Sequence, residues 1–252
     1  MMRLIYSFVF FIAVQFSLVH AEPDSGALDK FFVGDYEQSA ALAEGVGGAK
    51  NFALAARALN ASAYLENDDK TARKIAKRAR EFAKLAIEAD EALVEGHLQY
   101  AIAIAQRASR MSGFRAFLSG SAGKARDALD AALVLEPDNA WALSSSAAWH
   151  LGVARLAGDG RFGSDAELGH QQFLAAQRLD PENISIAYEA ALRLIAYGRE
   201  DWREAGIAAL AATLEMQPAT HFDRALQERA AAFDAAIDES ADAERAFIEG
   251  WS

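Results

Sequence analysis

The residues of this chain that could do chemistry are its histidines, its glycine-rich stretches and its many carboxylates. The histidines beyond residue 21 are His97, His150, His170 and His221. In a helical zinc site two histidines stand four residues apart, and no two of these do. The chain has no cysteine, and neither an H-E-x-x-H nor a G-x-S-x-G motif occurs. We therefore predict no catalytic residue, no metal site and no cofactor, and a protein that is not an enzyme.

Two glycine-rich stretches have features of phosphate-binding loops. GVGGAK occupies residues 45–50, and GSAGKA occupies residues 120–125. In the second stretch Ala125 follows Lys124, where a phosphate-binding loop has serine or threonine, and neither stretch follows an expected strand. We therefore expect neither stretch to bind phosphate.

Residues 107–124 form a basic amphipathic stretch within an acidic protein. One interpretation is a contact with an anionic lipid headgroup or an acidic partner. The other is a long hairpin whose apolar side packs on its neighbour while the arginines extend to water. The apolar residues at helical spacing are Met111, Phe114, Phe117 and Leu118, and the cations beside them are Arg107, Arg110 and Arg115.

The elements that position these residues follow from a repeated pattern, in which an apolar helix runs into an acidic residue, proline and a new apolar run. Pro137 and Pro181 mark the two clear copies, and Pro218 and Glu91 mark two weaker ones. In each copy, small or apolar residues stand 12, 8 and 5 positions before the mark. Proline lacks a backbone N–H and disfavours helix before it. The pattern therefore predicts helices that end at these four marks.

This pattern resembles the tetratricopeptide (TPR) family, whose 34-residue unit is a pair of antiparallel helices. The resemblance implies an all-α solenoid of about four helical hairpins. The marks at 91, 137, 181 and 218 lie 46, 44 and 37 residues apart, so the loops within the hairpins are expected to be lengthened. The longest insertions fall at residues 107–124 and 156–169, and whether they roof a cavity is left open.

The TPR resemblance also implies a concave face lined by the first helix of each unit. Trp and Tyr at such positions are typical anchors for a partner, because they bury a large area at low entropic cost. The aliphatic residues there are also explained as core between helices, and for the aromatic residues both interpretations stay open. The candidate residues on this face are Leu98, Ile102, Trp141, Ser144, Tyr188 and Leu192.

Two more specific likenesses add to the TPR resemblance. HLQYAIAIAQRA, residues 97–108, followed by the basic insertion, resembles the TPR domain of the regulator-of-microtubule-dynamics family, some of whose members handle phospholipid. The lengthened hairpins are similar to the periplasmic TPR component of TRAP transporters. That component is usually a lipoprotein, whereas this chain has no cysteine.

The start of the chain has the pattern of a secretory signal peptide. Arg3 precedes an apolar run from Leu4 to Val19, and cleavage is expected after Ala21. An uncleaved anchor is the alternative, but the run is shorter than the ~20 residues that span a bilayer. We expect a periplasmic protein with a signal peptide at residues 1–21 and a helical repeat domain, ending in a capping helix, at residues 22–252.

The net charge of −11 argues against nucleic acid as a partner, because phosphates need a basic face. The function expected is that of a non-enzymatic periplasmic scaffold, which engages a protein partner through its concave face. The alternative is binding of a small apolar ligand or lipid as an accessory to a transport system. The expected binding residues are the six on the concave face together with Arg110, Phe114 and Arg115.

Overall fold

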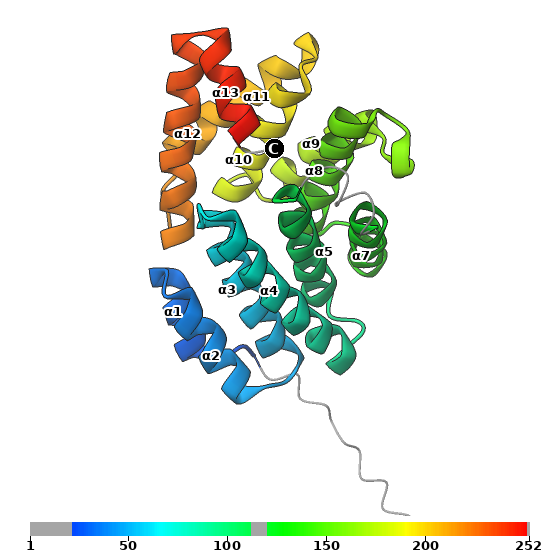
Figure 1. Ribbon diagram of the computed structural model, residues 1–252, viewed down its shortest axis with the longest axis vertical. Helices are drawn as coiled ribbons and strands as arrows, with labels where there is room; N and C mark the ends of the chain where they lie inside the picture. Colours follow the sequence, from blue (N-terminus) through cyan, green and yellow to red (C-terminus); the bar gives the residue numbers. More distant parts are fainter. Residues whose placement is uncertain (1–21, 112–119, 251–252) are drawn as a thin grey trace, which may run out of the picture.

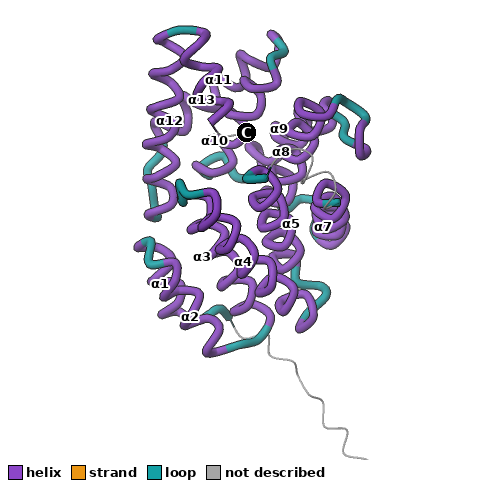
Figure 2. The backbone as a smooth tube through the Cα atoms, in the orientation of Figure 1, coloured by secondary structure: helices purple, strands orange, loops and turns teal. Residues whose placement is uncertain are grey.

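The computed structural model describes residues 22–111 and 120–250, and these ranges consist of helices joined by loops, without a strand (Figures 1 and 2). The predicted all-α solenoid-like fold is confirmed. Four antiparallel hairpins stand where the repeated pattern places them. They are α3 (Ala49–Leu65) with α4 (Asp69–Ala89), α5 (Val94–Ser109) with α7 (Ser121–Leu135), α8 (Ala140–Ala157) with α9 (Ala166–Leu179), and α10 (Ile184–Tyr197) with α11 (Glu200–Glu215).

A helical pair flanks this group of hairpins at each end. α1 (Ser25–Val33) packs on α2 (Tyr36–Val46) before the first hairpin, and α12 (His221–Glu239) packs on α13 (Ala241–Gly250) after the last. The expected single capping helix is therefore a pair of helices in the structure. Within the described ranges, no helix combines the length and apolar character needed to cross a membrane.

The boundaries of the helices follow the capping chemistry of the repeated pattern. The side chain of Asn139 accepts a hydrogen bond from the backbone N–H of Ala142 at 3.0 Å, and Asn183 does the same for Ile186 at 3.2 Å. These bonds satisfy N–H groups that lack a partner within the helix. α7 and α9 end two residues before their prolines, as predicted. The second long insertion contains a short 3-10 turn, Arg161–Gly163.

The small residues of the pattern let the two helices of a hairpin approach closely. In α4 these residues are Ala79, Ala83 and Ala86, and all three are fully buried. Gly206 in α11 lies against α10, where an added Cβ would come within 2.8 Å of Ile195 Cγ1. The residues that stand 12, 8 and 5 positions before each mark therefore form the buried face of the second helix of the hairpin.

The array curves until its two ends meet, as the blue and orange helices in Figure 1 show. The hydroxyl of Tyr36, at the start of α2, lies 3.1 Å from Nδ1 of His221, at the start of α12. The ring of Tyr64 at the end of α3 packs edge-on against Phe222, with centroids 5.6 Å apart. α12 therefore touches the first hairpins as well as the last.

Candidate binding surface

Four of the six residues expected on the concave face are buried in the structure. Tyr188 is 0% exposed, and Leu98, Leu192 and Ser144 are at most 5% exposed. The expectation that Tyr188 anchors a partner in an open groove is wrong. The physical reason is the curvature of the array, which packs α12 on α10 and places Tyr188 in one core cluster with residues of α12.

Trp141 and Ile102 are partly buried and pack on the core between α5, α7 and α8. The guanidinium of Arg57 stands 5.7 Å from the centre of the Trp141 ring. Trp141 therefore retains some accessible surface, but it has a cationic neighbour within the chain. These two residues do not form an aromatic groove with Tyr188.

A cluster of hydrogen-bonded polar side chains lies where α3, α10 and α12 meet. The hydroxyl of Tyr64 donates to Glu189 at 3.0 Å, and Nε of Arg193 donates to the same carboxylate at 3.2 Å. Arg229 donates to the carbonyl oxygen of Tyr64 at 3.3 Å. Burial raises the pKa of Tyr188 beside them. These contacts fasten the curved array from the inside.

The histidines lie apart and have separate packing roles. Nδ1 of His150 accepts from the backbone N–H of Asp165 at 2.9 Å, and burial lowers the pKa of His150. His170 stacks on Trp202 with ring centres 4.6 Å apart. His97 contacts the carbonyl of Glu91 at 2.8 Å. Within residues 22–111 and 120–250, no group of acidic residues and histidines could hold a metal ion.

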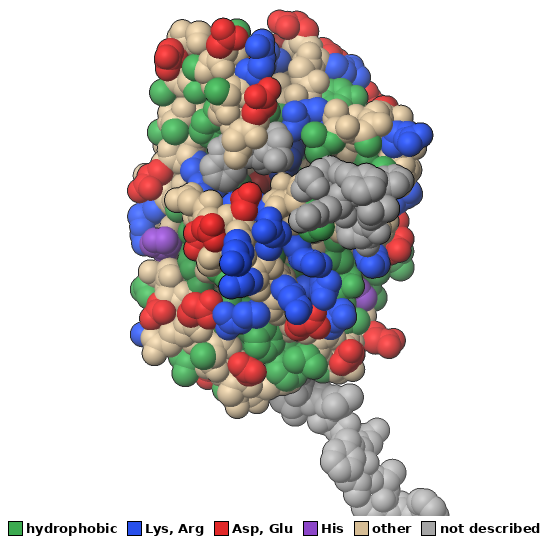
Figure 3. Space-filling view, viewed as in Figure 1, with side chains coloured by type: hydrophobic (Ala, Val, Ile, Leu, Met, Phe, Trp, Pro, Cys, Tyr) green, Lys and Arg blue, Asp and Glu red, His purple; other side chains and the backbone are tan. Residues whose placement is uncertain are grey.

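The most strongly charged surface lies over α4. This helix carries seven cations against three carboxylates, a net charge of +4 in a chain of −11. Figure 3 shows Lys and Arg side chains gathered there. The "basic surface" comprises Lys70, Arg73, Lys74, Lys77, Arg80 and Lys84 of α4, Arg107 and Arg110 at the end of α5, and Lys124 of α7.

Three lysines in one row of the basic surface have no ion pair with a described residue. Lys70, Lys74 and Lys77 are exposed and stand at i, i+4 and i+7 on α4. Like charges at this spacing repel by a few tenths of a kcal/mol per pair. Arg78, on the same helix, is instead neutralised by two hydrogen bonds of 2.8 Å to Glu37. The lysines therefore contribute positive charge to this surface that no ion pair within the described residues neutralises.

The described ends of the basic insertion predicted from the sequence, residues 107–111 and 120–124, adjoin this surface. Arg110 lies 3.1 Å from Asp69 of α4, and its carbonyl accepts a hydrogen bond from Arg73 at 2.6 Å. Phe114 and Arg115 lie outside the described residues. The structure thus joins Arg110 to α4, and Arg107 lines a pocket together with Arg80 and Lys84 of α4. The cationic face of α4 was not predicted from the sequence. Its period of three and four residues was visible in the sequence at positions 70, 73, 77, 80 and 84.

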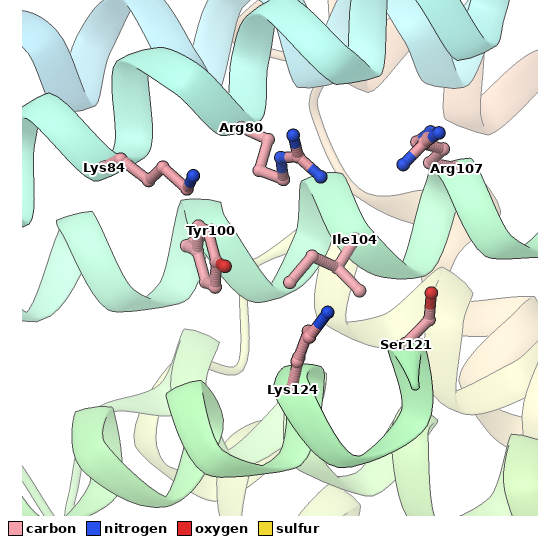
Figure 4. A pocket seen from close by; sticks show the side chains of 7 residues that line it. All are labelled: Arg80, Lys84, Tyr100, Ile104, Arg107, Ser121 and Lys124. Atoms are coloured by element: carbon pink, nitrogen blue, oxygen red, sulfur yellow. The ribbon is translucent and has the colours of Figure 1, made fainter. Parts of the chain in front are cut away.

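A pocket of about 160 Å³ opens within the basic surface between α4, α5 and α7 (Figure 4). Each helix contributes residues spaced three or four apart, which places them on one face. Four of the seven lining residues are cations. The lining consists of Arg80, Lys84, Tyr100, Ile104, Arg107, Ser121 and Lys124.

The fold thus defines an all-α array of helical hairpins with a basic surface on one side. The family model described as "Regulator of microtubule dynamics protein 1-3" matches residues 49–236, and the chain belongs to this family. The match begins at α3 and ends within α12, so it spans the four hairpins and the whole basic surface. A search of curated proteins found no match.

Proposed function

We propose that this protein is a non-enzymatic binding protein, which engages an acidic segment of a protein partner through the basic surface. One observation carries the proposal: Lys70, Lys74 and Lys77 form an exposed row of cations that make no ion pair within residues 22–111 and 120–250, on a chain of net charge −11. Such a row attracts a partner of opposite charge and speeds its association. We therefore propose that the partner binds on the face formed by α4. The concave face expected from the sequence is less suitable, because Tyr188 is buried there.

A protein partner accounts for the charge pattern better than nucleic acid does. α4 carries a net charge of +4, while the chain as a whole carries −11 and would repel a long phosphate backbone. The alternative of a small apolar ligand or lipid gains no support from the described pocket, because four cations line it.

Two further assignments belong to this proposal. We assign the hairpins to the TPR type because prolines and asparagine caps recur at the hairpin boundaries. We assign the chain to the periplasm because of the signal-peptide pattern at residues 1–21. The family name refers to microtubule dynamics. A periplasmic chain would not meet microtubules, so the partner proposed here is another acidic protein.

Site-specific photocrosslinking tests this proposal. A benzoylphenylalanine placed at Lys77 lies within the basic surface, and one placed at the exposed Arg178 of α9 is the matched control. We expect a polypeptide with an acidic segment to crosslink at position 77 and not at 178. Adding Lys70→Gln and Lys74→Gln should weaken the crosslink, as should added salt. Equal crosslinking at both positions, or no loss in the lysine variants, would contradict the proposal.

A further inference from the structure

The pocket in the basic surface has the composition of an anion site. Figure 4 shows Arg80 and Lys84 of α4 and Lys124 of α7 extending toward the same space beside α5. Arg107 contributes a fourth cation and Tyr100 a hydroxyl group. Four cations converging on one small volume repel one another, and an anion among them would relieve that repulsion.

Only part of this positive charge is compensated within the described chain. Glu81 accepts a hydrogen bond from Arg80 at 2.6 Å and lies 3.8 Å from Lys84. The hydrogen bond from Arg80 lowers the pKa of Glu81, which keeps it ionised. Glu81 is thus shared by two of the four cations, Arg80 and Lys84. Among the described residues, neither Arg107 nor the hydroxyl of Tyr100 has a hydrogen-bond partner.

The donors of the pocket suit a phosphoryl group. Arginine presents a planar set of N–H donors that matches the oxygens of a phosphate, and lysine adds point charges. The volume of about 160 Å³ is roughly ten times what one water molecule needs, which leaves room for a small polyphosphate. The ring of Tyr100 and the side chain of Ile104 supply one apolar wall.

A stretch noted in the sequence falls at this pocket. GSAGKA, residues 120–125, forms the first turn of α7, and its Ser121 and Lys124 line the pocket. Phosphate binding by this stretch is not expected from the sequence alone, because no strand precedes it and Ala125 replaces a hydroxyl residue. The structure supplies the cations from α4 and α5 instead of from a loop, and the positive end of the α7 dipole adds to them.

We propose that this pocket binds a small soluble anion bearing one or more phosphoryl groups, held chiefly by Arg107, Arg80 and Lys124. The site rests on the proposed function only in sharing the basic surface. The row of lysines at 70, 74 and 77 does not line the pocket. An experiment can therefore contradict the phosphoryl site without contradicting the acidic-partner surface, and the reverse.

Isothermal titration calorimetry of the purified protein with inorganic pyrophosphate tests the site. We expect saturable one-to-one binding, and a loss of affinity of about ten- to a hundredfold in Arg107→Gln, the range for a lost charge-assisted contact. Tyr100→Phe should lower affinity by a smaller factor. Lys77→Gln, which removes the same charge outside the pocket, is the control and should change affinity less than threefold.

Three outcomes would overturn the proposal of a soluble phosphoryl ligand in this pocket. The first is no binding at millimolar pyrophosphate. The second is an equal loss in Arg107→Gln and Lys77→Gln, which would show a diffuse field instead of a pocket. The third is citrate binding as tightly as pyrophosphate, which would assign the pocket to carboxylates. Vesicles containing anionic phospholipid distinguish a membrane source of the phosphoryl group. If the protein binds these vesicles but not free pyrophosphate, and Arg107→Gln abolishes vesicle binding, the pocket binds a lipid headgroup and the proposal of a soluble ligand is contradicted.

Discussion

Nη1 of Arg73 in α4 donates a hydrogen bond to the carbonyl oxygen of Arg110, just after the end of α5, at 2.6 Å. Arg110 in turn reaches back to Asp69 at 3.1 Å. The last turn of α5 is therefore fastened to the start of α4, although both carry cations. This connection makes the basic surface continuous across two helical hairpins.

Removing that connection should loosen the end of α5. We predict that Arg73→Met lowers the free energy of unfolding by about 1 kcal/mol, because one charged donor is lost from a carbonyl at a partly exposed site. Amide hydrogen exchange at residues 107–111 should become faster. Lys74→Met is the control, because Lys74 is the next residue of α4 and makes no ion pair with a described residue. Unchanged exchange at residues 107–111 in Arg73→Met would contradict the role of this bond.

The meeting of the two ends of the array can be tested at Gly34. This residue ends α1 with φ of +89°, and a Cβ there would lie 2.5 Å from Cγ of His221. Gly198 ends α10 with φ of +82° and open space around it. Both substitutions to alanine pay the same left-handed backbone cost of about 1 kcal/mol.

Gly34→Ala should therefore destabilise the protein more than Gly198→Ala does. The excess comes from separating α1 from α12, and hydrogen exchange should accelerate in the first turn of α12. Equal destabilisation, with no change in exchange in α12, would show that the ends do not rely on this contact.

The close packing of α10 and α11 gives a third prediction. Gly206→Ala would bring a methyl group within 2.8 Å of Ile195 Cγ1 and 3.3 Å of the carbonyl oxygen of Ala191. We expect a loss of about 1–3 kcal/mol in urea unfolding from overpacking. In Gly152→Ala, where the nearest atom is 3.9 Å away, improved helix propensity should stabilise by about 0.5–1 kcal/mol. A neutral Gly206→Ala would contradict the tight approach of these helices.

Acid should weaken the fold through His150. Burial, and next the charge of Arg126, lower the pKa of His150 in the folded protein below its ordinary value of 6.5. The unfolded chain thus binds a proton more readily, and stability is complete above pH 6.5 and falls as the pH drops below it. Protonation at Nδ1 would also remove the acceptor for the N–H of Asp165.

Urea unfolding between pH 5 and pH 8 measures this dependence. The loss of stability on acidification should be smaller in His150→Asn than in the wild type. Burial also lowers the pKa of His170, so part of the slope should remain. An undiminished slope in His150→Asn would show that His150 does not contribute.

The hairpins were predictable because their signals are local. The spacing of small residues before Pro137 and Pro181 indicates which face of α7 and α9 is buried, and the prolines indicate where these two helices end. The likeness of residues 97–108 to the regulator-of-microtubule-dynamics family was also confirmed.

What the sequence could not show depends on contacts between distant segments. Burial of Tyr188 requires α12 to pack on α10, and the meeting of Tyr36 with His221 joins residues 185 positions apart. No local pattern encodes either contact. The basic row on α4 was readable at helical spacing, but the pocket needs α5 and α7 beside it. The cationic face of α4 can therefore be predicted from the sequence. Which other helix faces stay exposed depends on the curvature of the whole array.

The most direct test of the account is the affinity of a fluorescent oligo-glutamate peptide, measured by anisotropy across a range of salt concentrations. Lys74→Gln/Lys77→Gln removes two charges from the basic surface, and Arg178→Gln/Arg224→Gln removes two from exposed positions on α9 and α12. We predict that the lysine variant loses affinity about five- to tenfold and depends less on salt, while the arginine variant resembles the wild type. Equal losses in both variants would contradict a dedicated acidic-partner surface on α4.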